Sequence, residues 1–169
     1  MTKSAFLFAA FTIALGFAAC KKDSDQATLH IRLTDGPGDY QQVNLDIREI
    51  RVKTSQDIDQ WLLLQTNAGV YNLLDFQNGI DTLLALGPVP AFTLQEVRFI
   101  LGPNNSVMVD GTLYPLETPS AEESGLKVKI GKNLSPNALL TLLLDFDAAE
   151  SVKEQGNGTF KLHPVIKLK

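Results

Sequence analysis

The feature that most constrains this chain is an alternation of apolar and polar residues with a period of two. It appears in the segments 29–33, 43–47, 126–130 and 160–168. Successive side chains of a strand point to opposite faces, so a period of two indicates β-structure, whereas an amphipathic helix has a period of 3.6. The pattern therefore predicts an all-β domain in which one face of most strands is buried.

Two local signals refine this prediction. The alternation of 43–47 slips by one residue before the apolar side resumes at Ile50, and such a slip predicts a β-bulge inside one strand. Asp110-Gly111 lies between the β-prone runs 107–109 and 112–114. Because both residues tolerate positive φ, this dipeptide is a preferred two-residue hairpin turn.

Other segments predict further strands. The short apolar runs 61–64 and 70–74 suggest a second hairpin, and 139–146 is apolar at nearly every position, which predicts a strand buried on both faces. The segment 160–168 predicts a last strand. Pro164 lacks a backbone N–H, which favours an edge position or a bulge for this strand.

Helical signal is confined to two short segments, 80–86, which Gly87-Pro88 would end, and 147–152. About eight to ten short strands separated by Gly, Pro and Asn indicate a β-sandwich. We therefore expect a single β-sandwich domain over residues 28–169, of transthyretin-like or immunoglobulin-like Greek-key kind, with one or two short helical turns.

The N-terminus has the pattern of a bacterial lipoprotein signal that ends at Cys20, the single cysteine. Lys3 precedes a nearly unbroken apolar run of 15 residues over 5–19, which is shorter than the about 20 residues that span a bilayer. Its length and the small residues at its end are typical of a cleaved signal peptide. An ordinary signal peptide with an incidental cysteine and a short membrane anchor are the alternatives, and Phe17 stands where such signals usually carry Leu.

We therefore expect a signal peptide over 1–19, followed by a lipidated Cys20 and a polar tether over 20–27. Acyl chains such as palmitate contribute about 0.8 kcal/mol per buried CH₂, and two or more chains give a stable anchor. The expected location is the outer membrane of the cell envelope, on either its periplasmic or its surface face. Acylation of Cys20 would leave no thiol for a disulfide or a redox site.

Charge limits the classes of partner. Without residues 1–19 the chain has 14 basic and 19 acidic residues, a net charge of −5. A general nucleic-acid-binding protein requires a basic surface and a high pI. The composition therefore excludes nucleic acid as the expected partner and leaves the membrane, a glycan or another envelope protein.

An ordered set of short motifs supports a family resemblance. The motifs are LTDGPGDY at 33–40, YNLLD at 71–75, DG at 110–111, YPL at 114–116, TPS at 118–120, SGLK at 124–127, LDFDAAESV at 144–152, GNG at 156–158 and LHPVI at 162–166. In this order they resemble the domain-of-unknown-function family 4382, found in bacterial lipoproteins, many from Bacteroidetes. The resemblance covers 28–168. It implies an exported, anchored β domain and supplies no catalytic residues.

The acidic residues form the first candidate site. Asp35 and Asp39 bracket a Gly-Pro-Gly turn, and Asp145 and Asp147 share one face at the end of an apolar strand. Ca²⁺ binds six to eight oxygen ligands of this kind, and calcium is the one cofactor that the pattern suggests. The alternative, favoured by how often such loop carboxylates are caps, is that they accept hydrogen bonds from nearby backbone N–H groups.

The polar faces of two strands form the second candidate. Lys127 and Lys129 belong to one strand, and Lys161, Lys167, Lys169 and His163 follow the other. Such a basic strip would suit an acidic glycan or a partner protein, but the net negative charge favours the alternative, a solvated sheet face with edge lysines. The aromatic residues that a glycan-binding face would use are Trp61, Tyr40, Tyr71 and Tyr114, and core packing is their commoner use.

No motif predicts an enzyme. Neither histidine, His30 or His163, has the spacing of a zinc site, and no Gly-x-Ser-x-Gly motif is present. We expect a non-enzymatic binding or structural module. The alternatives are a calcium- or glycan-binding adhesion module and, less favoured, a small carbohydrate-active enzyme that uses a carboxylate pair. Asp81-Thr82-Leu83 resembles a short acceptor sequence for O-glycosylation in Bacteroidetes, which makes Thr82 a candidate modification site.

Overall fold

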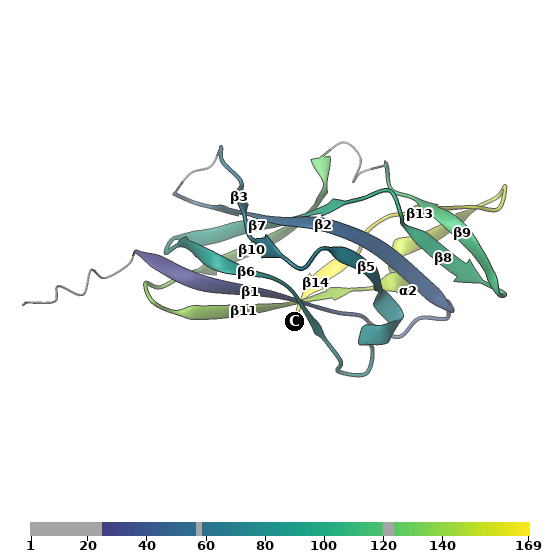
Figure 1. Cartoon of the computed structure of the whole chain (residues 1–169), viewed down its shortest axis with the longest axis horizontal. Coiled ribbons are helices and arrows are strands. Elements are labelled where there is room, and N and C mark those ends of the chain that lie inside the picture. The colour runs from purple at the N-terminus through teal and green to yellow at the C-terminus, as the bar shows by residue number, and fades with distance from the viewer. Residues whose placement is uncertain (1–24, 57–58, 120–123) are drawn as a thin grey trace, which may run out of the picture.

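The computed structural model describes residues 25–56, 59–119 and 124–169, which form two β-sheets packed face to face (Figure 1). The predicted all-β sandwich is confirmed. The predicted signal peptide, Cys20 and most of the tether lie outside the described residues. Among the described residues, no helix has both the length and the apolar character needed to cross a membrane.

The smaller sheet has five strands in the order β14-β11-β1-β6-β4. Their bounds are β1 Gln26–Thr34, β4 Gln65–Thr66, β6 Thr82–Pro90, β11 Leu139–Phe146 and β14 Ile166–Leu168. The central strand β1 pairs antiparallel with β6 and parallel with β11. The parallel pairing places the carboxyl ends of β1 and β11 at the same end of the sheet.

The larger sheet has nine strands, in the order β10-β7-β2-β8-β9-β13-β12, with β3 and β5 also paired to β2. Their bounds are β2 Gln42–Thr54, β3 Leu62–Leu63, β5 Gly69–Asn72, β7 Thr93–Leu101, β8 Ser106–Val109, β9 Thr112–Glu117, β10 Leu126–Asn133, β12 Val152–Gln155 and β13 Thr159–Leu162. The long strand β2 has β5 on one edge, and β7 followed by β8 on the other. The described residues also include two short helical turns, η1 Leu73–Phe76 and α2 Ala148–Ser151.

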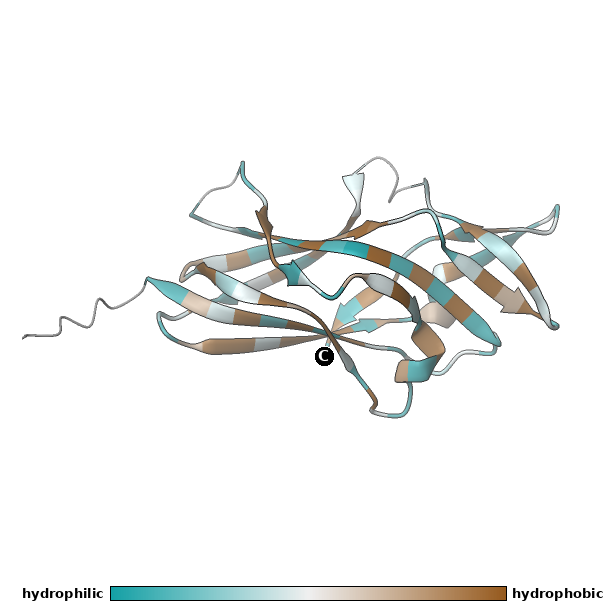
Figure 2. Ribbon diagram, viewed as in Figure 1, coloured by the Kyte–Doolittle hydropathy of each residue, from teal (hydrophilic) through white to brown (hydrophobic). Residues whose placement is uncertain are grey.

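The core lies between the two sheets and is built from the apolar side of each alternating strand, as the banded colouring of Figure 2 shows. Its largest fully buried side chains include Phe99 and Phe146, and burial of one such side chain contributes about 1.5–3 kcal/mol. Every buried hydrophobic residue of the described chain lies between Ala27 and Leu162.

The local signals in the sequence are confirmed in three places. The register of β2 against β7 shifts between Ile47 and Glu49, which is the predicted bulge. Asp110 and Gly111 both have positive φ, 48° and 75°, and join β8 to β9 in the predicted hairpin. Asp147 begins the helical turn α2, as the segment 147–152 predicted.

The helix expected at 80–86 is wrong, since most of this segment belongs to the strand β6. Residues of β6 pair along the length of β1, and this tertiary pairing outweighs the weak local helical preference. The strand also continues through Gly87-Pro88. The strand β4 pairs with β6 only at Ala85 and Leu86, so the edge of β6 that faces away from β1 has no strand partner at Pro88. A proline, which lacks a backbone N–H, is tolerated at such an unpaired edge.

The hairpin expected from 61–64 and 70–74 is also wrong. The strands β3 and β5 both pair with β2 and not with each other, because β2 is long enough to take both along one edge. Between them β4 crosses to the smaller sheet and pairs with β6. Asn67 continues this contact, since its backbone N–H donates to the Leu84 carbonyl at 2.8 Å.

The structure corrects the expectations for the segments 139–146 and 160–168. The segment 139–146 is buried on both faces only near its end. Leu139 is 61% exposed, whereas the three residues that pair with β14, Leu144 to Phe146, are all buried. The segment 160–168 is not one strand, because β13 belongs to the larger sheet and β14 to the smaller one. The chain passes between the sheets around Pro164, where the backbone N–H groups of His163 and Val165 donate to Ser151.

A buried carboxylate holds the bulged part of β2 against the turn between β7 and β8. Asp46 is fully buried, and its Oδ2 accepts from Arg48 Nη2 at 2.7 Å, Asn104 N at 3.2 Å and Asn104 Nδ2 at 3.0 Å. The Asp46 carbonyl accepts from Gly102 N at 2.7 Å, and its N–H donates to Asn105 Oδ1 at 2.9 Å. A Cβ atom on Gly102 would lie 2.3 Å from Asp46 Oδ2. A side chain at position 102 would therefore force the Asp46 carboxylate to move.

Candidate functional site

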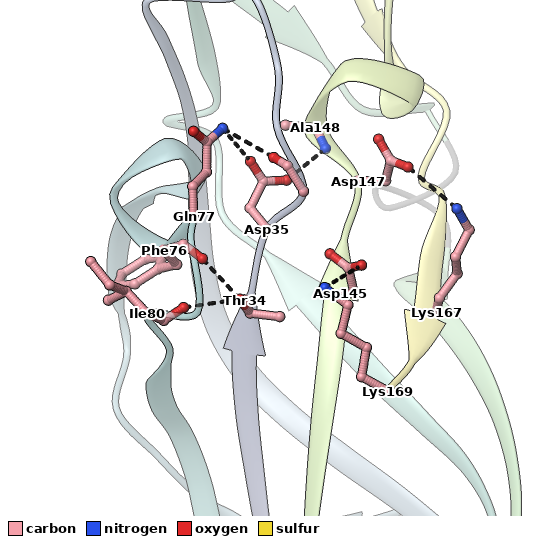
Figure 3. A network of polar contacts seen from close by, with 11 residues as sticks. Thr34, Asp35, Phe76, Gln77, Ile80, Asp145, Asp147, Ala148, Lys167 and Lys169 are labelled. Atoms are coloured by element: carbon pink, nitrogen blue, oxygen red, sulfur yellow. Dashed lines mark hydrogen bonds and ion pairs between the residues drawn. The ribbon is translucent and has the colours of Figure 1, made fainter.

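Three of the four predicted acidic residues meet where β1 and β11 end (Figure 3). Thr34 and Asp145 are Cα partners in the parallel pair of β1 and β11. Asp35 comes directly after the end of β1, and Asp147 comes directly after the end of β11. Burial raises the pKa of Asp35, and the carboxylates of Asp145 and Asp147 add to this rise, whereas hydrogen bonds from Ala148 and Gln77 oppose it. Asp39 is exposed and takes no part in these interactions among the described residues.

Asp35 joins three segments of the chain. Its Oδ1 accepts from the backbone N–H of Ala148 at 2.8 Å, at the start of α2, and its Oδ2 accepts from Gln77 Nε2 at 3.1 Å. The neighbouring Thr34 hydroxyl contacts the carbonyls of Phe76 and Ile80, at 2.8 and 2.9 Å. These contacts fasten the end of β1 to η1 and to α2, which is the capping role that the sequence offered as the alternative to calcium.

The other two carboxylates also have partners within the chain. Asp147 is the N-cap of α2, where its Oδ1 accepts from Glu150 N at 3.1 Å, and its Oδ2 lies 3.3 Å from Lys167 Nζ. Asp145 Oδ2 pairs with Lys169 Nζ at 2.9 Å, while the buried Oδ1 has no hydrogen-bond partner among the described residues.

A pocket of about 300 Å³ lies beside this acidic end, with Asp35, Asp81 and Lys169 in its lining. In the described ranges, no group of three or more His, Cys, Asp or Glu side chains is arranged to hold a metal ion. The calcium site stays a prediction.

The candidate O-glycosylation site lies close to this end of the smaller sheet. Thr82 is the first residue of β6, is half-buried and is the Cα partner of Leu33. The adjacent Asp81 forms an ion pair with Arg32 of β1. Modification of Thr82 stays a prediction.

The basic strip predicted from the sequence is divided between the two sheets. Lys127 and Lys129 lie on β10, at the edge of the larger sheet. Lys161 lies on β13 and pairs with Glu117 at 3.6 Å, whereas Lys167 and Lys169 pair with the acidic residues described above. His30 is half-buried on β1, and His163 is exposed between β13 and β14.

Register brings Lys127 and Lys129 together with cations that sequence reasoning did not single out. Arg98 of β7 is the Cα partner of Arg51 on β2 and of Lys127 on β10. Directly opposite residues of neighbouring strands project from the same face of a sheet. We call Arg51, Arg98 and Lys127 the cationic row.

The cationic row lies on the outer face of the larger sheet, since the next residues along the three strands, Val52, Val97 and Val128, are buried in the core. The neighbouring row, formed by Lys53, Glu96 and Lys129, has mixed charge.

Arg98 is the centre of this face. Its guanidinium carbon lies 3.8 Å from the centroid of the Trp61 ring, and Lys53 Nζ lies 5.8 Å from the same ring. Arg98 Nε is buried and has no hydrogen-bond partner in the described chain. Burial lowers the pKa of Arg98, the positive charge of Arg51 lowers it further, and Glu96 opposes both effects. Arg51 itself pairs with Glu49, with Nη2 2.6 Å from Oε2.

The four aromatic residues predicted for a glycan-binding face separate into two groups. Tyr114 packs on the Phe160 ring at 5.1 Å between centroids, Tyr71 lies 6.2 Å from Phe76, and the Tyr40 hydroxyl donates to the Val152 carbonyl at 3.3 Å. These three support the fold. Trp61 alone contacts the cationic face. The alternating charges at 49–53 and 96–98 are visible in the sequence, but only the register shows that they meet.

The chain matches a family model described as a domain of unknown function, DUF4382, over residues 26–164. This chain belongs to the DUF4382 family. The resemblance noted from the sequence motifs is thereby confirmed. The matched DUF4382 region includes the acidic end, the cationic row and Trp61. No curated protein and no solved structure matches the chain.

Proposed function

We propose that this DUF4382 protein is an exported lipoprotein, acylated at Cys20, and that its β-sandwich is a non-enzymatic binding module of the cell envelope. The observation that carries the binding role is the cationic row. Like charges directly opposite each other on neighbouring strands destabilise a sheet. Local arrangements that oppose stability are expected at functional sites, where a ligand supplies the missing counter-charge.

The charge of the remaining chain strengthens this argument. The residues from Cys20 onward have a net charge of −5, yet the rows around Arg98 contain five cations and two carboxylates, Glu49 and Glu96. Positive charge is therefore concentrated on one face of an acidic protein. Such concentration favours an anionic partner over a neutral one.

The anchoring role is supported by the sequence before β1. The apolar run 5–19 ends directly before Cys20, and β1 begins at Gln26, six residues later. Six extended residues span at most about 21 Å. An acylated Cys20 would therefore hold the sandwich close to the membrane surface.

Metabolic labelling with a palmitate analogue in the native host tests the anchor. The wild-type chain should be labelled and should sediment with membranes, whereas Cys20→Ser should lose the label and enter the soluble fraction. Label that persists in Cys20→Ser would refute acylation at this residue. Protease treatment of intact cells then distinguishes the two faces of the outer membrane, because only a surface-exposed domain is cleaved.

A thermal-shift screen of the chain from residue 21 onward tests the binding role. The panel contains acidic and neutral glycans and calcium, and a ligand in excess of its Kd raises the unfolding temperature. A shift without chemical change of the ligand supports a non-enzymatic module, and cleavage of a glycan would instead support the carbohydrate-active alternative. If no component of the panel shifts the unfolding temperature, the binding role loses its support.

Calcium binding at the acidic end is a second candidate, favoured by the buried Asp145 Oδ1 that lacks a hydrogen-bond partner among the described residues. An ion at this position would compete with Lys169 for Asp145. A calcium-induced rise in unfolding temperature that disappears in Asp145→Asn would support this site. A rise that persists in that variant would exclude it.

A further inference from the structure

The geometry of the cationic row limits the shape of its partner. Neighbouring strands lie about 4.8 Å apart, so three cations on three strands form a line about 10 Å long that crosses the strands. On one side of this line Glu96 lies between Lys53 and Lys129, and on the other side Glu49 is bound to Arg51. The uninterrupted positive charge is therefore a line and not a plane.

Arg98 supplies the geometry for recognising a charged group. Contact with the Trp61 ring restricts its guanidinium, whose planar fork binds carboxylate, phosphate or sulfate oxygens in pairs. Arg51 and Lys127 flank it on either side. An anionic group bound at Arg98 would relieve the repulsion among the three cations, and further anions along the same line would contact its neighbours.

Apolar surface lies at one end of the line. Leu63 of β3 is the Cα partner of Arg51 and continues the row across a fourth strand, with 62% of its surface exposed. Trp61, two residues before it, is partly exposed above the same face. Sugar rings present both apolar C–H faces and charged substituents, so a charged sugar polymer matches both parts of this surface.

Resting on the proposed binding function, we infer that the cationic row binds a linear acidic polysaccharide whose carboxylate or sulfate groups pair with Arg51, Arg98 and Lys127. A flat anionic membrane fits this face less well, because Glu49 and Glu96 would lie against its headgroups. Nucleic acid fits less well too, since proteins that bind it tightly neutralise about six to ten phosphates, more than one row of three cations supplies.

The test uses the chain from residue 21 onward, which retains the whole described core. Binding is measured by calorimetry with heparin as the sulfated polymer, polygalacturonate as the carboxylated polymer and neutral dextran as the uncharged polymer. Phosphatidylglycerol vesicles and a single-stranded oligonucleotide are measured in parallel. We expect at least one acidic polysaccharide to bind more tightly than the vesicles or the oligonucleotide, dextran not to bind, and affinity to fall as salt is raised.

Variants of the row connect this binding to the site. Lys127→Gln and Arg98→Gln should each weaken binding at least tenfold. Arg98→Lys should lie between Arg98→Gln and wild type, because it keeps the charge and loses the fork. Lys153→Gln, on β12 at the other end of the same sheet, is the matched control and should bind as wild type. Lys127 is exposed, so its replacement tests the site even if Arg98→Gln impairs folding.

Several results would overturn the inference. They are equal affinity of wild type and Lys127→Gln, a stronger response to vesicles or to the oligonucleotide than to either acidic polysaccharide, and equal binding of dextran. Binding of dextran alone would leave the proposed binding module intact while excluding an acidic ligand. Absence of binding to all five probes would count against both.

Discussion

The buried carboxylate of Asp46 makes a quantitative prediction about Gly102. In Gly102→Ala the new Cβ would lie 2.3 Å from Asp46 Oδ2 and 2.5 Å from Arg48 Nε, so both atoms must move. Overpacking of this kind costs about 1–3 kcal/mol, and loss of one hydrogen bond to a charged group adds about 1.5–3 kcal/mol. We expect Gly102→Ala to lower the free energy of unfolding by about 3–4 kcal/mol.

A double-mutant cycle tests whether this cost comes from Asp46. Asp46→Ala alone should cost about 3 kcal/mol, because the hydrogen bonds that its charged carboxylate accepts from Asn104 and Arg48 are lost, although both of these exposed residues can turn to water. In the double variant the methyl group introduced at position 102 occupies space that the carboxylate vacated. The two costs should therefore fall short of additivity by about 2 kcal/mol.

Urea unfolding followed by circular dichroism and by Trp61 fluorescence measures these values. For a domain of this size, 3–4 kcal/mol corresponds to a fall of about 10 °C in Tm. Gly156→Ala is the matched control, since its Cβ would meet no atom within 4 Å, and it should be neutral or slightly stabilising. If the two costs add to within about 0.5 kcal/mol, the steric explanation for Gly102 is refuted.

Three further predictions concern the acidic end and the core. Asp147→Ala should lower the free energy of unfolding by about 1 kcal/mol through loss of the N-cap of α2, whereas Asp39→Ala should leave it unchanged in the same urea titration. Because burial raises the pKa of Asp35, its stabilising contribution should be complete below about pH 4 and should decline as pH rises through the raised pKa. The difference in unfolding free energy between wild type and Asp35→Asn, measured across this range, should show that decline, and a rise would contradict it. Phe99→Ala should cost about 3–5 kcal/mol, and a loss below about 1 kcal/mol would contradict its place in the core.

Local sequence patterns predicted the elements whose conformation is decided by neighbouring residues. The bulge before Ile50, the Asp110-Gly111 turn and the α2 turn after Asp147 all follow from spacing or from tolerance of positive φ. The segment 80–86 failed because its strand conformation depends on pairing with β1, which is distant in sequence. The same limit applies to 61–64 and 70–74, whose partner is β2.

The candidate sites also divide into features that neighbouring residues determine and features that depend on pairing between distant strands. Capping by Asp147 could be predicted from its position before a short helical segment, whereas the meeting of Asp35 with Asp145 depends on the parallel pairing of β1 with β11. The cationic row could not be predicted from the sequence, because Arg51, Arg98 and Lys127 belong to three strands. Their alignment depends on two registers, that of β2 with β7 and that of β7 with β10. A shift of one residue in either register would place one of these cations on the opposite face of the sheet.

The parallel pairing of β1 with β11 has a consequence for how the chain reaches its folded state. Each residue of β1 in this pair meets a partner 111 positions later in the sequence, as Thr28 meets Leu139. Non-local pairings of this kind slow folding, since the entropy of closing the long intervening loop is lost before the contact stabilises the fold. For a chain that crosses a membrane N-terminus first, as proposed, the centre of the smaller sheet stays incomplete until β11 has emerged. If the chain is exported as proposed, this topology would delay folding until nearly the whole domain has crossed the membrane, and the chain would stay unfolded during the transfer.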